Sequence, residues 1–149
     1  LVFRGATEQH ELSAPQDSDD VDVRGLGEFL YEPDGAVIRA RLIGELAARL
    51  DAGMMSDSIA YLTSDRLVET PFAQSFRIVE SLPAREKDLR RALAARDIGT
   101  LEIKKRGADV DPAQLRKRLK LQGSKHATLF LTRVAGKHTA LLTERCTGA

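Results

Sequence analysis

Apolar residues between positions 34 and 53 recur at helical spacing. Asp34 can cap the free backbone N–H groups at the start of a helix, and the apolar stripe behind it has the width of a core-facing helix. The stripe consists of Ile38, Leu42, Ile43, Leu46, Ala47 and Leu50. The pattern predicts a helix from Asp34 that Gly53 is placed to end in a left-handed turn. A short strand is expected at 59–63, closed by the turn-rich Ser64 and Asp65.

The second half of the chain alternates between strand and helix patterns. Alternating apolar residues predict strands, leucines three to four residues apart predict helices, and Ala135-Gly136-Lys137 indicates a hairpin turn. Asp111 followed by Pro112 is a favourable helix start. The predicted elements are, in order, strand 75–80, helix 85–95, strand 100–106, helix 112–121 and hairpin strands 128–134 and 139–144. The order β-α-β-α-β-β predicts an α+β fold, an α/β sandwich with helices packed on a sheet.

The first 27 residues have a different character. Leu1-Val2-Phe3 is typical of a strand, so the chain is expected to open at the end of a strand and to be a piece of something larger. Residues 13–27 are polar, acidic and poor in hydrophobes, which indicates an exposed linker. The globular part is therefore expected to begin near residue 28.

Composition narrows the class of protein. Hydrophobic residues make up 42% and charged residues 30% of the chain, which favours a soluble globular protein over a disordered one. No apolar run approaches the roughly 20 residues of a membrane-spanning helix, and no leader peptide is expected. Cys146 is the only cysteine, so no internal disulfide can form. We expect a cytoplasmic protein without membrane contact.

Charge divides the chain into an acidic part and a basic part. Residues 1–84 carry 7 Lys/Arg and 15 Asp/Glu, whereas residues 85–149 carry 16 Lys/Arg and 7 Asp/Glu. Such an asymmetry points to different partners for the two parts, and the basic part suits a polyanion. The alternative is that the two parts attract each other.

Eight cations of the basic part lie close together in the sequence. They are Lys104, Lys105, Arg106, Arg116, Lys117, Arg118, Lys120 and Lys125. With Leu101 and Ile103 inward on the predicted strand, Lys104 and Arg106 share its outer face with Glu102. On the predicted helix, Leu115 and Leu119 face the core, Arg116, Lys117 and Lys120 lie on the opposite arc, and Arg118 lies at the flank. The eight are candidate contacts to a nucleic-acid backbone, and a solvated basic face is the alternative.

The sequence contains no recognisable reaction centre. The chain has no phosphate-binding loop, no cysteine or histidine cluster at metal-ligand spacing and no serine elbow. Gly25-Leu26-Gly27 is too short for a nucleotide-binding fingerprint, and His10, His126 and His138 are scattered. We expect no catalytic residue, metal site or cofactor site in this chain. With no aromatic residues beside the cations to stack on bases, recognition would depend on backbone shape.

Several blocks of sequence resemble a family of bacterial class I methyltransferases that have a C-terminal THUMP-like domain. The similar blocks are LYEPDGAVIRA at 30–40, YLTSD at 61–65, IKKRG at 103–107, LRKRLKL at 115–121 and ATLFLTRV at 127–134. Actinobacterial members look most similar. Within the first block, Pro33 and Asp34 also have a plain structural interpretation, as a rigid entry and a helix cap, and a contact to a missing domain is the alternative.

The resemblance implies a catalytic Rossmann-like domain that precedes this chain, then a ferredoxin-like domain at 28–73 and a THUMP-like domain at 74–149, with 1–27 as strand end and acidic linker. The glycine-rich cofactor loop and the acidic-Pro-Pro-aromatic motif of such catalytic domains are not in the sequence. S-adenosylmethionine and methyl transfer are thus implied for the parent enzyme and not for this chain. THUMP domains generally bind RNA, often tRNA, in RNA-modifying enzymes.

Three hypotheses follow. The leading one is an RNA-binding, substrate-docking module of an S-adenosylmethionine-dependent methyltransferase, whose partners are RNA, tRNA in particular, and the missing N-terminal methyltransferase domain. The second is a structural module that positions or dimerises the catalytic domain without binding RNA. The third, a free-standing enzyme, would require cofactor binding by this chain alone.

Overall fold

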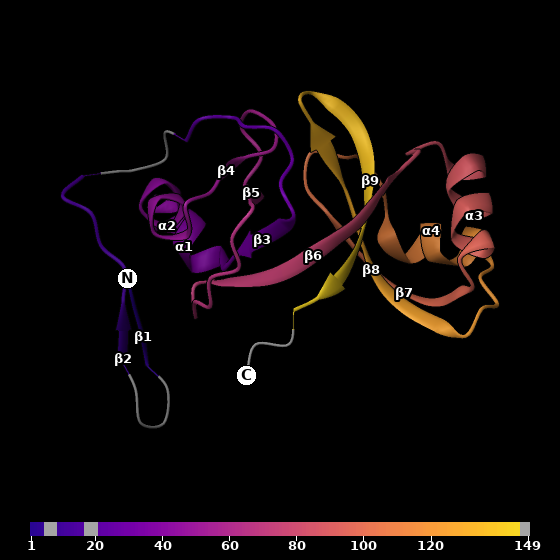
Figure 1. Cartoon of the computed structure of the whole chain (residues 1–149), viewed down its shortest axis with the longest axis horizontal. Coiled ribbons are helices and arrows are strands. Elements are labelled where there is room, and N and C mark those ends of the chain that lie inside the picture. Colours follow the sequence, from indigo (N-terminus) through magenta and orange to yellow (C-terminus); the bar gives the residue numbers. More distant parts are fainter. Residues whose placement is uncertain (5–8, 17–20, 147–149) are drawn as a thin grey trace. The chain divides into compact units, whose positions relative to one another are not determined.

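A computed structural model describes residues 1–4, 9–16 and 21–146 of the chain (Figure 1). The chain divides into two compact units. The first unit comprises Leu1–Phe76 with the chain end from Cys146, and the second comprises Arg77–Arg145. Among the described residues, no helix is long and apolar enough to cross a membrane.

The first unit combines short strands with two helices. β1 (Val2–Arg4) pairs antiparallel with β2 (Gln9–Glu11), and β4 (Gly53–Met54), β5 (Leu62–Ser64) and β3 (Phe29–Pro33) form antiparallel neighbours in that order. The helices are α1 (Gly35–Arg39) and α2 (Ile43–Leu50). Its core includes Leu12, Tyr31, Val37, Leu46, Leu50, Leu62 and Phe72.

The helix predicted from Asp34 is broken in two. Asp34 caps α1 as predicted, since its carboxylate accepts a hydrogen bond from the Ala36 N–H at 2.8 Å. The chain then turns at Arg41, which has a φ of 60°, and the N–H of Leu42 bonds back to the Val37 carbonyl. This is a helix-ending Schellman turn with arginine where glycine is usual. Periodicity could not detect the break because Leu42 and Ile43, which follow it, are buried in the same core.

The predicted end of the second helix was also wrong. Asp51, with a φ of 50°, ends α2, and the N–H of Ala52 bonds to the Ala47 carbonyl. Gly53 lies in β4 instead, where a Cβ atom would come within 2.5 Å of the Arg24 Nε and 2.8 Å of the Asp22 carbonyl oxygen. This glycine permits a close approach of two chain segments and not a left-handed turn.

Two further predictions for the first unit need correction. The strand expected at 59–63 begins only at Leu62, and β3 was not predicted because three of its five residues are buried, without the alternation of an exposed strand. The predicted linker lies partly outside the described residues, at 17–20. Within its described part, Val23 forms a bridge with Met54, so the backbone there is hydrogen-bonded to β4.

The second unit has the order predicted from the sequence. Its elements are β6 (Ala73–Leu82, which begins in the first unit), α3 (Glu86–Ala95), β7 (Ile98–Lys105), α4 (Pro112–Leu119), β8 (Lys125–Val134) and β9 (Lys137–Arg145). The strand order is β6-β9-β8-β7, with β7 parallel to β8 and β8 antiparallel to β9. The α+β fold is confirmed. Ala135 and Gly136, both at positive φ, make the predicted hairpin turn.

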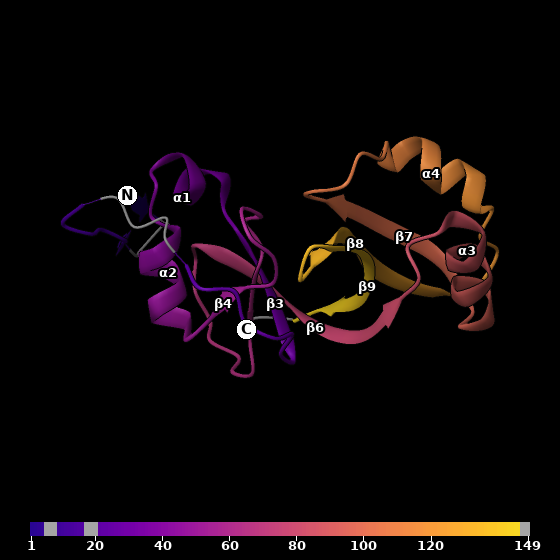
Figure 2. The same ribbon diagram turned by 90° about the horizontal axis from the view of Figure 1, so that it is seen from above.

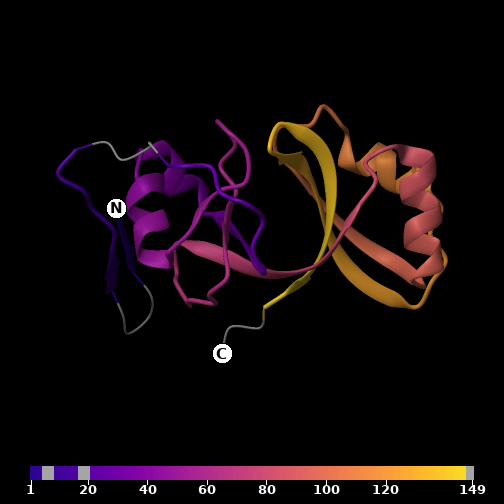
Figure 3. The ribbon, with the colours of Figure 1, turned by 45° about the horizontal axis from the view of Figure 1, so that its top comes forward.

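Both helices of this unit pack on the same face of its sheet (Figures 2 and 3). Asp111 caps α4 as predicted and accepts hydrogen bonds from the N–H groups of Ala113 and Gln114. The shared core contains Leu89 and Leu93 of α3, Leu115 and Leu119 of α4, and Leu101, Ile103, Leu129, Leu131 and Leu142 of the sheet. Strand residues between these therefore face away from the helices.

The start of β7 is in tight contact with the loop that precedes β8. A Cβ atom on Gly99 would lie 1.8 Å from the Gly123 carbonyl oxygen, so only glycine fits there. The Asp97 carboxylate accepts hydrogen bonds from the backbone N–H and the hydroxyl of Ser124. These two bonds hold the pKa of Asp97 below its ordinary value, and the nearby Lys125 charge adds to the effect. The contact fixes the start of both parallel strands.

Candidate nucleic-acid interface

All eight predicted RNA-binding cations lie in the second unit, on three adjoining elements. Lys104 and Lys105 end β7 and Arg106 follows them. Arg116, Lys117 and Arg118 belong to α4, Lys120 caps its C-terminal end and Lys125 begins β8. The structure does not gather all eight on one face of the sheet.

Lys104 lies on the face of the sheet away from the helices. Its neighbours Leu101 and Ile103 are in the helix-side core, so Glu102 and Lys104 point the other way, as predicted. There the Lys104 Nζ lies 3.4 Å from the Glu102 carboxylate, which also accepts two hydrogen bonds from the Arg145 Nη2 at 2.8 and 3.0 Å. Desolvation would raise the pKa of Glu102, but Arg145 and Lys104 together outweigh it and lower that pKa. Lys104 is thus engaged with a carboxylate.

Arg116 is held by the outermost strand. Its Nε donates a hydrogen bond to the Leu101 carbonyl at 3.0 Å. Because β7 is the last strand in the order, this guanidinium occupies part of an open sheet edge. Arg116 stays exposed, so it can still offer charge to a partner from a fixed position.

Arg118 joins the two helices. Its Nε lies 2.8 Å from the Glu86 carboxylate at the start of α3. Both side chains are about half exposed, at 51% and 47%, so the pair is a surface ion pair of modest strength, about 0–1 kcal/mol. Part of the Arg118 charge is therefore neutralised within the unit.

The remaining cations are more open. Lys105, Lys117, Lys120 and Lys125 are exposed, and within the described part of the chain none of their side chains has an ion pair at 4.0 Å or less. Lys117 points directly away from the Leu115 and Leu119 stripe at about 100° per residue. Among the eight cations, most of the charge without a carboxylate partner therefore lies on the helix side of the sheet.

Arg106 is placed by its backbone, since its N–H donates a hydrogen bond to the Leu131 carbonyl.

Three more cations, which are not among the eight predicted from the sequence, lie on the helix side of the sheet. Lys87, Arg90 and Arg91 are exposed on α3, which packs beside α4. At about 100° per residue, Lys87 and Arg91 lie on the side of the helix opposite Leu89 and Leu93, and Arg90 lies at the flank of that side. This signal was available in the sequence, but no resemblance pointed to it and the two helices are far apart along the chain.

A groove of the second unit that contains both apolar and charged residues gives no clear charge preference. It has a volume of about 470 Å³ and lies where β6, β7 and β8 end, with apolar residues such as Leu89, Leu115 and Leu131 in its lining. Arg85 and the Glu86–Arg118 pair lie at its rim together with Asp109, so positive and negative charges nearly cancel. Within the described ranges, no three His, Cys, Asp or Glu side chains form a group that could hold a metal ion.

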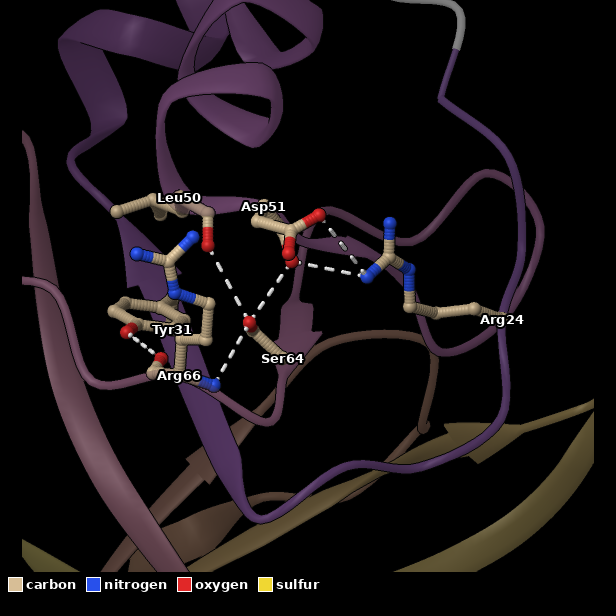
Figure 4. A network of polar contacts seen from close by, with 6 residues as sticks. All are labelled: Arg24, Tyr31, Leu50, Asp51, Ser64 and Arg66. Carbon is tan, nitrogen blue, oxygen red and sulfur yellow. Dashed lines mark hydrogen bonds and ion pairs between the residues drawn. The ribbon is translucent and has the colours of Figure 1, made fainter.

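The distinctive motifs of the first unit form an internal polar network (Figure 4). The buried Tyr31 hydroxyl donates to the Arg66 carbonyl at 2.6 Å and accepts from the Val68 N–H at 2.8 Å. Burial raises the pKa of Tyr31. The Ser64 hydroxyl lies 2.9 Å from the Asp51 carbonyl oxygen and accepts from the Arg66 N–H at 3.1 Å. The blocks at 30–40 and 61–65 are also joined directly by the antiparallel pairing of β3 with β5, in which Leu30 lies opposite Thr63 and Tyr31 opposite Leu62, and this supports the structural interpretation of these residues.

The chain is similar to part of several known proteins. Residues 73–145 match the family described as THUMP domain-like. Over 124 residues, the chain is 41% identical to uncharacterized S-adenosylmethionine-dependent methyltransferases from two Mycobacterium tuberculosis strains, CDC 1551/Oshkosh and ATCC 25618/H37Rv. These matches cover 83% of the chain but 34% of each relative, so the chain spans about a third of their length.

A solved structure shows the same fold. A crystal structure of a candidate methyltransferase from Porphyromonas gingivalis W83 matches 87% of this chain and 32% of its own, with a TM-score of 0.70. At 23% sequence identity, this likeness establishes shared architecture only.

Proposed function

Since the chain carries a THUMP-like domain in a region homologous to part of bacterial S-adenosylmethionine-dependent methyltransferases, we propose that it is the part of such an enzyme that docks an RNA substrate. The catalytic domain would lie in the remaining two thirds of the protein. In this proposal the chain captures RNA, with tRNA as the leading candidate, and holds it for methylation by that domain.

The cofactor does not fit the residues of this chain. A nucleotide-type cofactor is usually held by a glycine-rich loop between a strand and a helix. Here the loop after β6 is Pro83-Ala84-Arg85, and the loop after β7 has one glycine, Gly107, before Ala108. S-adenosylmethionine binding and methyl transfer are therefore assigned to the rest of the parent protein.

The excess positive charge of the second unit carries the proposal. Residues 77–145 contain 17 Lys/Arg and 8 Asp/Glu, and several cations on the helix side have no carboxylate partner in the described part of the unit. Lysines and arginines that neutralise phosphates release counterions, which favours binding to nucleic acid. Phe130 is the only Phe, Tyr or Trp of the unit and is fully buried, so no such ring can stack on bases. Recognition would rest on the RNA backbone.

The internal ion pairs favour a second candidate function. Lys104 and Arg145 share Glu102, Arg118 pairs with Glu86, and Arg96 with Glu80. Cations used in this way stabilise a rigid module that positions or dimerises a catalytic domain without RNA. This alternative predicts tight binding to the parent's catalytic domain and none to RNA.

A filter-binding titration with bulk tRNA at several salt concentrations tests the proposal. We expect affinity to fall steeply with salt, and Lys117→Glu with Lys120→Glu to weaken binding by at least about tenfold. Arg4→Glu with Arg39→Glu, which reverses two exposed charges in the first unit, serves as the matched control and should change affinity little. Equal losses in both variants, or binding that ignores salt, would contradict RNA docking by the second unit.

A further inference from the structure

Helix α3 presents a row of cations that lies outside the cluster of eight. Lys87, Arg90 and Arg91 are exposed, and their spacing of three and four residues places them on one side of the helix. Leu89 and Leu93 on the other side are buried in the sheet-facing core. Lys87 and Arg91 are therefore directed away from the sheet, and Arg90 lies at the flank of the row.

The cations of α3 and α4 belong to one layer. Both helices pack on the same face of the sheet, and the Arg118–Glu86 ion pair joins them directly. Arg90 of α3 and Lys120 at the end of α4 also line one groove of about 400 Å³. Here the name "helical face" denotes five exposed cations of this layer whose side chains, unlike those of Arg116 and Arg118, make no hydrogen bond or ion pair in the described part of the chain: Lys87, Arg90, Arg91, Lys117 and Lys120.

The positive charge of the helical face is not compensated locally. In the described part of the chain, its five cations have no ion pair. Among the acidic groups of this layer, Glu86 is engaged with Arg118 and Asp97 with Ser124, and Asp88 is half-buried in the first turn of α3. Lys87 repels Arg90 and Arg91 at these helical spacings, whereas Glu86 and Asp88 attract Arg90 and Arg91 at spacings of four and three residues without forming an ion pair at 4.0 Å or less in the described part of the chain, so these cations stay available to a polyanion.

The opposite face of the sheet differs in this respect. Its cations Lys104 and Arg145 both contact the Glu102 carboxylate, and threonines such as Thr128 and Thr143 lie buried between the strands. Two of the cations there are thus partly neutralised before any partner arrives. Lys120 also lies at a helix C-terminus, where a cation stabilises the helix dipole, but Lys87 and Arg91 have no such local role.

We infer that the RNA backbone lies on the helical face, with Lys87, Arg90 and Arg91 as phosphate contacts beside Lys117 and Lys120, and that Lys104 is not among the contacts. This inference rests on the proposed function and identifies its surface. It adds three residues of α3 to the binding site and moves the site from the strand to the helix layer.

Two double variants with equal charge change test the inference on the chain of 149 residues. Lys87→Gln with Arg91→Gln removes one lysine and one arginine from the helical face, and Lys104→Gln with Arg145→Gln removes the same pair from the other face. In tRNA titrations over a range of salt, the first should lower affinity at least about tenfold and reduce the salt slope by about two. The second should leave both quantities unchanged.

A charge-preserving variant, Lys87→Arg with Arg91→Lys, should bind as the unchanged chain does, and far-UV circular dichroism checks that each variant folds. Loss of affinity only in the Lys104 and Arg145 variant would overturn the inference while leaving RNA docking intact. Absence of RNA binding by the unchanged chain would overturn the proposed function, and this inference with it. Displacement of tRNA by poly-glutamate at equal charge would mean an acidic protein partner and would also overturn the inference.

Discussion

The two units of this chain use their polar residues in opposite ways. In the first unit, the distinctive polar side chains of Tyr31, Thr63 and Ser64 are buried and bonded to backbone groups of the same unit. In the second, the distinctive polar residues are exposed cations, many without a partner among the described residues. A recognisable motif can therefore specify the fold in one region and a binding surface in another, and burial distinguishes the two cases.

The largest loss of stability is expected in the second unit at Gly99, where two backbone segments touch. Gly99→Ala would place a Cβ atom 1.8 Å from the Gly123 carbonyl oxygen, and neither backbone segment can yield cheaply. We expect the free energy of unfolding to fall by about 3 kcal/mol or more, measured by chemical denaturation. Gly25→Ala, with no heavy atom within 4 Å of its Cβ, is the control and should change it by less than about 0.5 kcal/mol. A Gly99 variant as stable as the control would mean that the start of β7 does not touch the loop before β8.

A smaller effect is expected in the polar network of the first unit. Tyr31→Phe removes the hydroxyl that serves the Arg66 carbonyl and the Val68 N–H, and leaves both backbone groups without this partner. The free energy of unfolding should fall by about 1–3 kcal/mol, while tRNA affinity stays unchanged. If the variant lost RNA binding but not stability, Tyr31 would have a direct role in binding. The distinction between the two units would then be wrong.

The pH dependence of stability tests whether the cations around Glu102 in the second unit are paired within the fold. The folded-state pKa of Glu102 lies below the model-compound value of 4.5, so its ion pairs stabilise the fold above that pH and the effect is lost as pH falls through the folded pKa. Thermal unfolding measured between about pH 6 and about pH 3 should show that this group's contribution to the free energy of unfolding falls by about 0.2–1 kcal/mol. The contribution is small because the Glu102 side chain is exposed. Glu102→Gln should remove that part of the pH dependence. An identical profile in the variant would show that the Glu102 cluster is not formed in solution.

The sequence predicted the second unit better than the first, for physical reasons. Its strands and helices each have a regular apolar period, so the order β-α-β-α-β-β could be predicted. In the first unit, β3 is buried on both sides and the helix break at Arg41 interrupts no apolar stripe. Left-handed turns at Arg41 and Asp51 lack the glycine that usually marks them.

Part of the candidate site was likewise accessible to sequence reasoning. The alternation on β7 correctly placed Lys104 beside Glu102 on the outer face. The involvement of Arg145 could not be predicted, because it lies 43 residues from Glu102 in sequence and meets it only through the sheet. For the same reason, the ion pair between Arg118 and Glu86 that joins α4 to α3 could not be predicted from the sequence.

The salt dependence of tRNA affinity for the unchanged chain tests the central claim most directly. If five cations of the second unit neutralise backbone phosphates, the logarithm of the association constant should fall linearly with the logarithm of salt concentration, with a slope of about −3.5 to −4.5. A slope near zero, or no binding of tRNA at about 50 mM salt, would contradict the account and favour a module that only positions its catalytic domain.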